Sequence, residues 1–368
     1  MRIAIDASAA AGPAGSGVPR YVRQLSAALA LITTGELILC YRPSRIRHRA
    51  RVEVPATGCV RQRLLLAPFD PWLEHKVDVF HGPDARLPAL RRPALVATVH
   101  DLFSLISDRF GPESFRRKKA AFYNDIARRA DLILTVSQHS RADILQHLGV
   151  EPERVQVVHV AAAGAFGRAR PEDLARVRAG YDLPERYVLF VGDVSARKNV
   201  AGLVRAFRAL ANREHAGGCS LIVVGKDGYG AAEARRAAEG APPRQIRFLG
   251  HAAQSDLPAL YAGARVFAFP TLYEGFGVPV LEAFQSGVPV VAGNRTSLPE
   301  VAGDAALLVD PEDEEALASA VERAIRDETL REELKAKGAR RAQAFSWERC
   351  ATETLAAYRW AVERKESG

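Results

Sequence analysis

The stretch YVLFVGDVSARKNVAGLVRAFRAL, residues 187–210, decides the fold because it joins a strand, a polar turn and a helix. Its first five residues are apolar, as in a strand that is buried on both faces. The turn GDVSARKN follows, and the apolar positions after it recur at helical spacing. This order is typical of one βα unit of a parallel sheet.

The same pattern recurs on both sides of this stretch. In the first half, the expected strands are RIAIDA, LILCYR, DVFHG, LVATVHD, LILTVS and VQVVHV. In the second half, they are YVLFVG, LIVVGK, QIRFLG, VFAFP, VPVVAG and AALLVD. Residues 161–185, rich in Gly, Pro and charge, separate the two series and are the expected interdomain connection. We therefore predict an α/β protein with two doubly wound Rossmann-like domains, 1–168 and 182–346, and a C-terminal helix, 347–366, that packs back on the first domain.

Length and composition agree with this organisation. A chain of 368 residues suits two domains, and 48% hydrophobic with 26% charged residues is a globular composition. The sequence has no apolar run of about 18 residues and its first residues do not resemble a signal peptide. We expect a cytoplasmic protein, with membrane association left open. The four cysteines form no CxxC pair, and neither HExxH nor Asp-x-Asp occurs. No metal and no cofactor are therefore expected.

The positive charge lies in the first half of the chain. Residues 1–170 contain 25 Lys and Arg against 15 Asp and Glu, a net +10, whereas the remainder has 26 against 28, a net −2. The excess is concentrated in YRPSRIRHRAR, residues 41–51, and FRRKK, residues 115–119. These runs favour an anionic partner, either a phosphate-bearing acceptor or an acidic membrane surface, although a solvated face is the alternative. Nucleic acid is not favoured, because the basic runs lack aromatic stacking platforms.

Two motifs of the first half follow expected strands. Residues 9–25, AAAGPAGSGVPRYVRQL, place Gly15 and Gly17 where a backbone could approach a ligand at the start of a helix. Arg20 stands where GxGxxG would have its third glycine, so dinucleotide binding is not supported and a plain turn is the alternative. His100 and Asp101 end another buried strand, which favours a functional site over a structural histidine.

Two further motifs belong to the second half. In GDVSARKN, Arg197 and Lys198 stand at a strand exit where two cations could hold a diphosphate, and Asn199 could cap the next helix. Solvated surface charges are the alternative. In LYEGFGVPVLEAF, residues 272–284, Glu274 should lie on a loop and Glu282 one turn inside a helix that begins near Pro279 and stops at Gly287. A dipole partner would explain one of these acids but not the glycines.

Residues 248–311 closely resemble the signature of the retaining GT-B glycosyltransferases of family 4. Glu274 and Glu282 match the family's Glu-x7-Glu motif, and GDVSARKN is similar to its diphosphate-binding loop. The runs GSGVPRY, TVHDL and LTVSQHSRADI also resemble the family, in the same order. The resemblance implies two doubly wound domains that face a central cleft. It also implies a nucleotide-sugar donor held mainly by the C-terminal domain and an acceptor held mainly by the N-terminal domain.

The resemblance assigns a role to each matching residue. Arg197 and Lys198 would stabilise the diphosphate, Glu274 would contact hydroxyls of the sugar and Glu282 would bind the ribose. The other residues implied at the site are Gly15, Gly17, Asn199, Phe248, His251, Gly275, Phe276 and Gly277 for the donor, His100 for the donor sugar, and Asp101 and Arg20 for the acceptor. One departure is Asp193, because many relatives carry an arginine there.

The implied reaction is retaining transfer to a hydroxyl group, without a metal or a protein nucleophile. Similarity to bacterial mannosyl- and rhamnosyltransferases of polysaccharide assembly favours GDP-mannose as donor, and a glycan, lipid-linked or small-molecule acceptor. A GT-B epimerase or phosphorylase and a non-catalytic sugar-nucleotide-binding protein are the alternatives. A dinucleotide oxidoreductase is disfavoured by the absence of GxGxxG in the first loop.

Overall fold

The structure is a computed structural model and describes residues 1–12, 17–55, 57–66, 68–167, 169–211 and 218–367. The chain divides into two compact units. Unit 1 comprises Met1–Ile106, Glu113–Ala161 and Phe345–Gly368, and unit 2 comprises Ser107–Pro112 and Ala162–Ala344. The short segment 107–112 thus belongs to unit 2, although its neighbours in the chain belong to unit 1.

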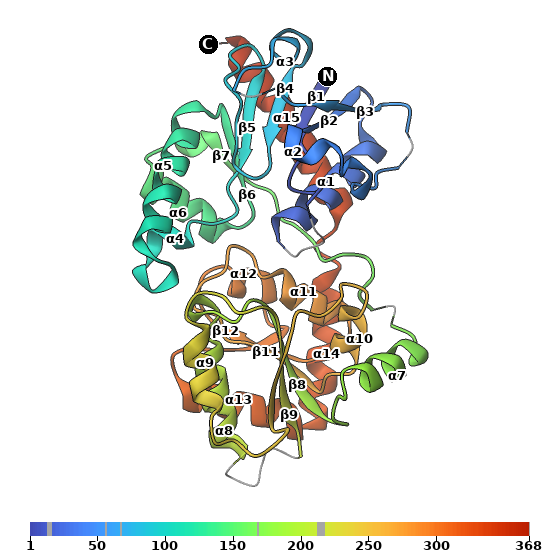
Figure 1. The fold of residues 1–368 in the computed structure, drawn as a ribbon, viewed down its shortest axis with the longest axis vertical. Coiled ribbons are helices and arrows are strands. Elements are labelled where there is room, and N and C mark those ends of the chain that lie inside the picture. The colour runs from blue at the N-terminus through green and yellow to red at the C-terminus, as the bar shows by residue number, and fades with distance from the viewer. Residues whose placement is uncertain (13–16, 56, 67, 168, 212–217, 368) are drawn as a thin grey trace. The chain divides into compact units, whose positions relative to one another are not determined.

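Unit 1 is built on a parallel sheet in the order β3-β2-β1-β4-β5-β6-β7. Its strands are β1 Arg2–Asp6, β2 Glu36–Tyr41, β3 Val60–Leu64, β4 Val79–Gly82, β5 Ala94–Thr98, β6 Leu132–Thr135 and β7 Val155–Val157. Its helices are α1 Val18–Ile32, α2 Pro43–Ile46, α3 Pro71–Lys76, α4 Phe103–Ile106, α5 Glu113–Arg129, α6 Gln138–Leu148 and α15 Trp347–Ser367. The C-terminal helix α15 packs against α1 and β5, although these two elements lie near the other end of the sequence (Figure 1).

Unit 2 is built on a second parallel sheet in the order β10-β9-β8-β11-β12-β13. Its strands are β8 Tyr187–Val191, β9 Ser220–Val224, β10 Ile246–Gly250, β11 Val266–Phe269, β12 Val290–Gly293 and β13 Ala306–Val309. Its helices are α7 Pro171–Gly180, α8 Val200–Ala211, α9 Ala231–Ala238, α10 Leu257–Ala262, α11 Val278–Gln285, α12 Leu298–Ala302, α13 Glu314–Arg326 and α14 Glu328–Ala342. Helix α8 packs against α9 and α13, and α11 packs against α10, α12 and α14.

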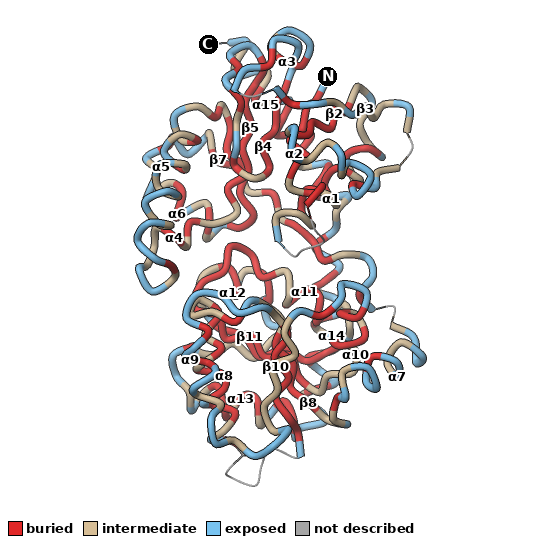
Figure 2. Tube along the Cα trace, in the orientation of Figure 1, coloured by how far each residue is buried: buried red, intermediate tan, exposed pale blue. Residues whose placement is uncertain are grey.

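Burial explains why these residues form parallel sheets. The central strands β1, β4, β5, β8, β9 and β11 are buried along almost their whole length, whereas the edge strands β3, β10 and β13 are partly exposed (Figure 2). A strand covered by helices on both faces needs apolar residues throughout, which is the pattern that the sequence showed. No helix in the described part of the chain combines the length and apolar character needed to span a membrane.

The predicted α/β class and the twelve predicted strands are confirmed, but one strand was missed. Strand β3, VRQRL, lies at the edge of the first sheet, where it pairs with β2 among the described residues. Its Arg61 is exposed, whereas Arg63 is half-buried. An edge strand of this composition gives no apolar run, so hydrophobic patterning cannot find it. The expected interdomain connection also contains a helix, α7, which was not predicted.

Candidate active site

The candidate site of unit 2 lies beyond the carboxyl ends of β8 and β11. These two strands are neighbours in the sheet, and the chain order reverses between them, since β9 lies on the other side of β8. Such a switch point leaves room for a ligand, because the loops leave the two strands in opposite directions. The loop after β8 contains the 3₁₀ turn η4, Ala196–Lys198, and the loop after β11 contains residues 270–277.

The predicted cations and one predicted acid form a single cluster. The Arg197 guanidinium donates to the Tyr273 carbonyl at 2.6 Å and to Glu274 Oε1 at 3.2 Å. The Lys198 ammonium donates to the same carboxylate oxygen of Glu274. A backbone hydrogen bond of 2.9 Å from Leu272 N–H to the Arg197 carbonyl joins the two loops. The cluster thus brings together residues that the sequence analysis had assigned to different parts of a donor.

The backbone of Glu274 is held by residues that the sequence analysis did not identify. Its N–H donates to Thr296 Oγ1 at 3.0 Å, and its carbonyl accepts from Ser297 Oγ at 2.9 Å. Both residues follow β12, the next strand in the sheet. The run GNRTSLPE, residues 293–300, could have predicted these two contacts. It follows the strand next to β11, and loops after neighbouring parallel strands lie at the same edge of a sheet. These bonds fix the acid before any ligand contacts it.

The three charged side chains of the cluster are largely buried, which changes the pKa of Lys198. The side chains of Lys198 and Glu274 are each 10% exposed, and that of Arg197 is 18% exposed. Desolvation lowers the pKa of Lys198 below its ordinary value, while the neighbouring Glu274 opposes that shift. The ammonium also lies 4.8 Å from the centre of the Phe269 ring, a stabilising position for a cation. Two cations and one carboxylate leave one net positive charge in a nearly dry site.

The glycine turn before α11 has the predicted form. Helix α11 begins at Val278, directly after Gly277, and ends at Gln285, before Gly287 with its φ of +68°. Gly277 has a φ of +100°, and a β-carbon there would come within 2.6 Å of Leu298 Cδ2. Only glycine suits that position. Gly275 and Phe276 are buried in the same turn.

Glu282 lies in α11 and is 2% exposed. The Tyr261 hydroxyl of α10 donates to its Oε2 at 3.0 Å. Sequence reasoning did not identify Tyr261, whose ring packs between those of Phe166 and Phe267. A buried carboxylate needs such partners, so this contact holds Glu282 in one orientation.

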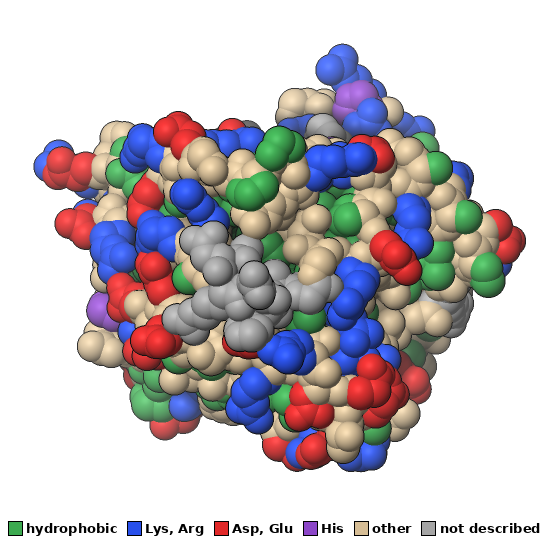
Figure 3. All heavy atoms as spheres, turned by 90° about the horizontal axis from the view of Figure 1, so that it is seen from below, with side chains coloured by type: hydrophobic (Ala, Val, Ile, Leu, Met, Phe, Trp, Pro, Cys, Tyr) green, Lys and Arg blue, Asp and Glu red, His purple; other side chains and the backbone are tan. Residues whose placement is uncertain are grey.

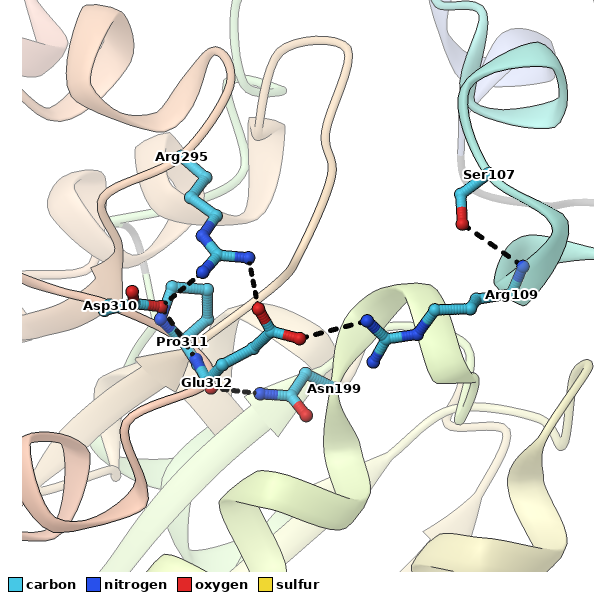
Figure 4. Close-up of polar contacts among 7 residues, drawn as sticks. All are labelled: Ser107, Arg109, Asn199, Arg295, Asp310, Pro311 and Glu312. Carbon is cyan, nitrogen blue, oxygen red and sulfur yellow. Dashed lines mark hydrogen bonds and ion pairs between the residues drawn. The ribbon is translucent and has the colours of Figure 1, made fainter.

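Asn199 joins the cation loop to the turn after β13. Its φ of 52° and ψ of 38° are left-handed, and its amide donates to the Pro311 carbonyl at 2.5 Å. Arg295 binds both acids that flank that proline, Asp310 at 2.7 Å and Glu312 at 2.7 Å. Arg109, from the segment 107–112, donates to the other oxygen of Glu312 at 3.0 Å (Figure 4). This network holds the end of the loop that carries Arg197 and Lys198.

Of the residues predicted near the nucleobase, Phe248 lies within the edge strand β10 and His251 directly follows it. The Phe248 ring is partly exposed, and the Arg235 guanidinium lies 4.2 Å above its centre. His251 is exposed. Asp193, the departure from the family pattern, is exposed and lies near enough to Lys198 to favour its charged form. None of these contacts by itself assigns a ligand.

In unit 1, the described residues of the prediction lie at the start of α1 and directly after β5. Gly17 precedes α1 with a φ of +73°, and Arg20 lies in the first turn of that helix. Gly15 falls outside the described residues. Asp101 Oδ1 accepts from the Phe103 N–H at 3.4 Å, close to the start of α4.

His100 has a defined tautomer. Its Nε2 lies 3.0 Å from the Pro83 carbonyl, and a carbonyl can only accept, so Nε2 carries the proton. Burial lowers the pKa of His100, so the neutral ring presents Nδ1 as an acceptor at neutral pH. The Tyr21 ring meets the imidazole edge-on at 4.7 Å. A neutral acceptor of this kind suits a hydroxyl group better than a phosphate.

A second histidine of unit 1, which the sequence analysis did not single out, lies in a fully buried network. His81 Nδ1 is 2.7 Å from the Tyr358 hydroxyl of α15, and its Nε2 is 2.7 Å from Thr98 Oγ1. Thr98 Oγ1 is also 3.1 Å from the Tyr21 hydroxyl, and Tyr21 is the residue that packs on His100. The network connects the C-terminal helix to the surroundings of His100.

We expect His81 to make unit 1 sensitive to acid. Burial lowers the pKa of His81 to about 3, whereas an unfolded histidine has a pKa near ~6.5. As the pH falls from about 6.5 towards 3, His81 takes up a proton in the unfolded chain but not in the folded protein. Up to about 5 kcal/mol of the free energy of unfolding is therefore lost. Urea unfolding of the wild type and His81→Gln at several pH values measures this. The variant should lose less stability on acidification, while Tyr358→Phe, which keeps the histidine, should retain the dependence. Equal pH slopes for the wild type and His81→Gln would contradict the assignment.

Among the described residues, no group of three or more His, Cys, Asp or Glu side chains is arranged to hold a metal ion.

Two parallel-sheet α/β units, with charged and glycine-rich loops beyond the carboxyl ends of their strands, are the architecture of GT-B glycosyltransferases. Comparisons with known proteins give the family. Residues 15–161 match the model of Glycosyltransferase Family 4, and residues 172–341 match that of Glycosyl transferases group 1. The chain belongs to the family 4 glycosyltransferases.

Individual relatives agree with this membership. The O-antigen chain mannosyltransferase B of Escherichia coli is 36% identical over 288 residues, which are 78% of this chain and 75% of that protein. The serotype-specific mannosyltransferase WbdA of Escherichia coli is 29% identical over 83% of this chain, which spans only 39% of WbdA. The crystal structure of Anabaena HepE with UDP and glucose has a TM-score of 0.74 at 19% identity, covering 97% of this chain and 99% of HepE.

Proposed function

We propose that this glycosyltransferase moves a sugar from a nucleotide-sugar donor to a hydroxyl group with retention of the anomeric configuration. The observation that carries the proposal is the cluster of Arg197, Lys198 and Glu274 at the switch point of unit 2. The preferred donor is GDP-mannose, which the names of the mannosyltransferase relatives support. The acceptor is a glycan, a lipid-linked sugar or a small molecule.

The cation pair gives the site its chemistry. When a nucleotide sugar breaks, negative charge grows on the diphosphate that leaves. Arg197 and Lys198 are already positioned and largely desolvated, so they stabilise this charge without reorganisation. Glu274 holds both cations through one carboxylate oxygen and offers its other oxygen to a hydroxyl of the sugar. Under this proposal, the two cations do the work that a metal does elsewhere, and activity survives a chelator.

The transfer needs no protein nucleophile. The acceptor hydroxyl approaches the anomeric carbon from the face that the diphosphate leaves, and a new C–O bond forms as the bond to the phosphate oxygen breaks. The hydroxyl proton passes to that departing phosphate oxygen, so charge and atoms balance. In unit 1, His100 Nδ1 would accept a hydrogen bond from a hydroxyl of the donor sugar, and Asp101 and Arg20 would contact the acceptor.

A donor panel tests the proposal. The protein is incubated with UDP-, GDP- and dTDP-sugars and a mannose-terminated glycan, with and without a chelator, and the product is examined by NMR. An α-linked product from an α-linked donor, formed with the chelator present, is the expected result. Inversion or dependence on added metal would overturn the proposed mechanism. Consumption of inorganic phosphate, or isomerisation of the donor without acceptor, would favour a phosphorylase or an epimerase.

Glu282 gives a separate prediction about donor binding. Glu282→Ala should weaken the affinity for GDP-mannose by about 1–3 kcal/mol, because the ribose hydroxyls lose a buried acceptor. Tyr261→Phe is the matched control, since it removes the same internal hydrogen bond and leaves the carboxylate in place. Calorimetric titration should find a large loss for the first variant and a small loss for the second. Equal affinities of Glu282→Ala and the wild type would contradict a role in the donor site.

A further inference from the structure

Large apolar side chains are exposed in one short stretch of unit 1. Among the described residues, the exposed large hydrophobic side chains are Met1, Leu31, Leu64, Leu66, Phe69, Trp72 and Tyr229. Four of the seven fall between Leu64 and Trp72, at the end of edge strand β3 and the start of α3. Scattered exposed hydrophobic residues are ordinary, but four within nine residues of the chain indicate an interaction surface.

A buried carboxylate holds this stretch in shape. Asp70 is fully buried and accepts from the N–H groups of Leu66 at 3.2 Å, Trp72 at 3.2 Å and Leu73 at 3.1 Å. It also accepts from Arg63 at 3.2 Å, and the Arg63 guanidinium lies 4.3 Å from the centre of the Trp72 ring. A carboxylate with four donors fixes the turn at both ends. The apolar side chains are thus presented by an ordered backbone.

A cationic segment leaves the sheet beside this stretch. Strand β2 ends at Tyr41, which pairs with Leu64 of β3, and Leu65 N–H donates to the Tyr41 carbonyl at 2.7 Å. The chain then enters residues 42–51, and α2 in this segment contacts β3. Residues 41–66 contain seven arginines and a single acid, Glu53.

Several of these arginines have no acidic partner. Arg42 is paired with Asp6 at 2.7 Å, and the segment is anchored at its other end by the buried Val52. Within the part of the chain that the structure describes, Arg47, Arg49 and Arg51 are exposed and form no ion pair with an acid. In contrast, the face of the protein seen in Figure 3 mixes acidic and basic side chains. The positive charges of Arg47, Arg49 and Arg51 are therefore not compensated by an acidic partner among the described residues.

We propose that Leu64, Leu66, Phe69, Trp72, Arg47, Arg49 and Arg51 form a basic-apolar surface that docks on an anionic lipid bilayer. The apolar side chains enter the boundary between headgroups and acyl chains, and the arginines bind the lipid phosphates. Charge complementarity selects this occupant, because a lipid surface supplies anions at every arginine and an apolar layer beside them. The proposal does not rest on the proposed reaction.

Vesicle sedimentation tests the proposal with the chain of 368 residues and without any donor. Vesicles of equal parts phosphatidylglycerol and phosphatidylcholine should bind the wild type, and vesicles of phosphatidylcholine alone should bind it at least tenfold less. The variant Arg47→Ser/Arg49→Ser/Arg51→Ser should lose on the order of 10²-fold in partitioning, at about tenfold or less for each charge. The variant Phe69→Ser/Trp72→Ser should lose at least tenfold.

Matched controls separate this surface from general stickiness. Arg117→Ser/Lys118→Ser/Arg128→Ser removes the same charge from exposed positions of α5, and Leu31→Ser removes another exposed apolar side chain. Both controls should bind vesicles nearly as the wild type does. Equal losses in the two triple variants would overturn the proposal in favour of net charge alone. A change of oligomeric state in Phe69→Ser/Trp72→Ser with unchanged vesicle binding would overturn it in favour of a second copy of the chain.

Discussion

Lys198→Met should lower the turnover number by about 10²-fold or more, with a smaller effect on KM. Methionine keeps the length and apolar stem of the side chain but removes the charge that would stabilise the departing diphosphate. Loss of one preorganised charge stabiliser costs roughly 10²- to 10³-fold in turnover. Steady-state kinetics with GDP-mannose measures the effect.

Lys226→Met is the matched control for this variant. Lys226 also follows a strand of unit 2, the neighbouring β9, but its side chain is exposed. It should keep wild-type turnover. Urea unfolding of Lys198→Met must also be recorded, because Glu274 keeps only Arg197 as a cationic partner. Wild-type turnover in a folded Lys198→Met protein would remove the cation pair from the mechanism.

Glu274→Ala should destabilise unit 2 by about 3–5 kcal/mol, besides removing the carboxylate that we propose for contact with the sugar. Breaking a buried pair leaves an uncompensated charge, and Lys198 is only 8% exposed. The double variant Glu274→Ala/Lys198→Met should recover most of this stability, because removing both partners leaves no buried lone ammonium. Arg197 loses its acidic partner in both variants, but its more exposed guanidinium can turn to water.

An exposed ion pair provides the comparison for this cycle. Glu314 bonds Arg205 at 2.6 Å, with both side chains 42% exposed, so Glu314→Ala should change stability by only about 0–1 kcal/mol. Equilibrium unfolding in urea gives the free energy of unfolding of the wild type, of Glu274→Ala, of Glu274→Ala/Lys198→Met and of Glu314→Ala. If Glu274→Ala and Glu314→Ala cost the same, the cluster does not behave as a buried pair.

The sequence predicted those parts of the fold that depend on burial. Each strand covered on both faces is a run of mostly apolar residues. The loops that carry the charged and glycine residues of the candidate site follow such runs. Strand β3 was missed because Arg61, Gln62 and Arg63 interrupt it, so it contains no apolar run. Both ends of α11 were predicted because Gly277 before it and Gly287 after it leave a local signature, confirmed by their positive φ values.

For the candidate site, the sequence predicts a list of residues but not the contacts among them. Lys198 and Glu274 are 76 residues apart, and no local pattern indicates that they share a hydrogen bond. The network of His81 and Tyr358 spans 277 residues, and a lone histidine in an apolar strand gives no sign of its partner. Thr296 and Ser297 were within reach of the topological rule, since they follow the strand next to β11.

Unit 1 combines early segments of the chain with a late one, and this has a consequence for synthesis on the ribosome. Its core needs α15, whose Tyr358 completes the surroundings of His81, and α15 lies in the last 24 residues, Phe345–Gly368. All residues of unit 2 have been translated by Ala344. Although unit 1 starts first, unit 2 can complete its core earlier, and a nascent chain stalled before α15 would present an unfinished N-terminal sheet to chaperones. Truncation from the C-terminus should therefore damage the N-terminal unit first.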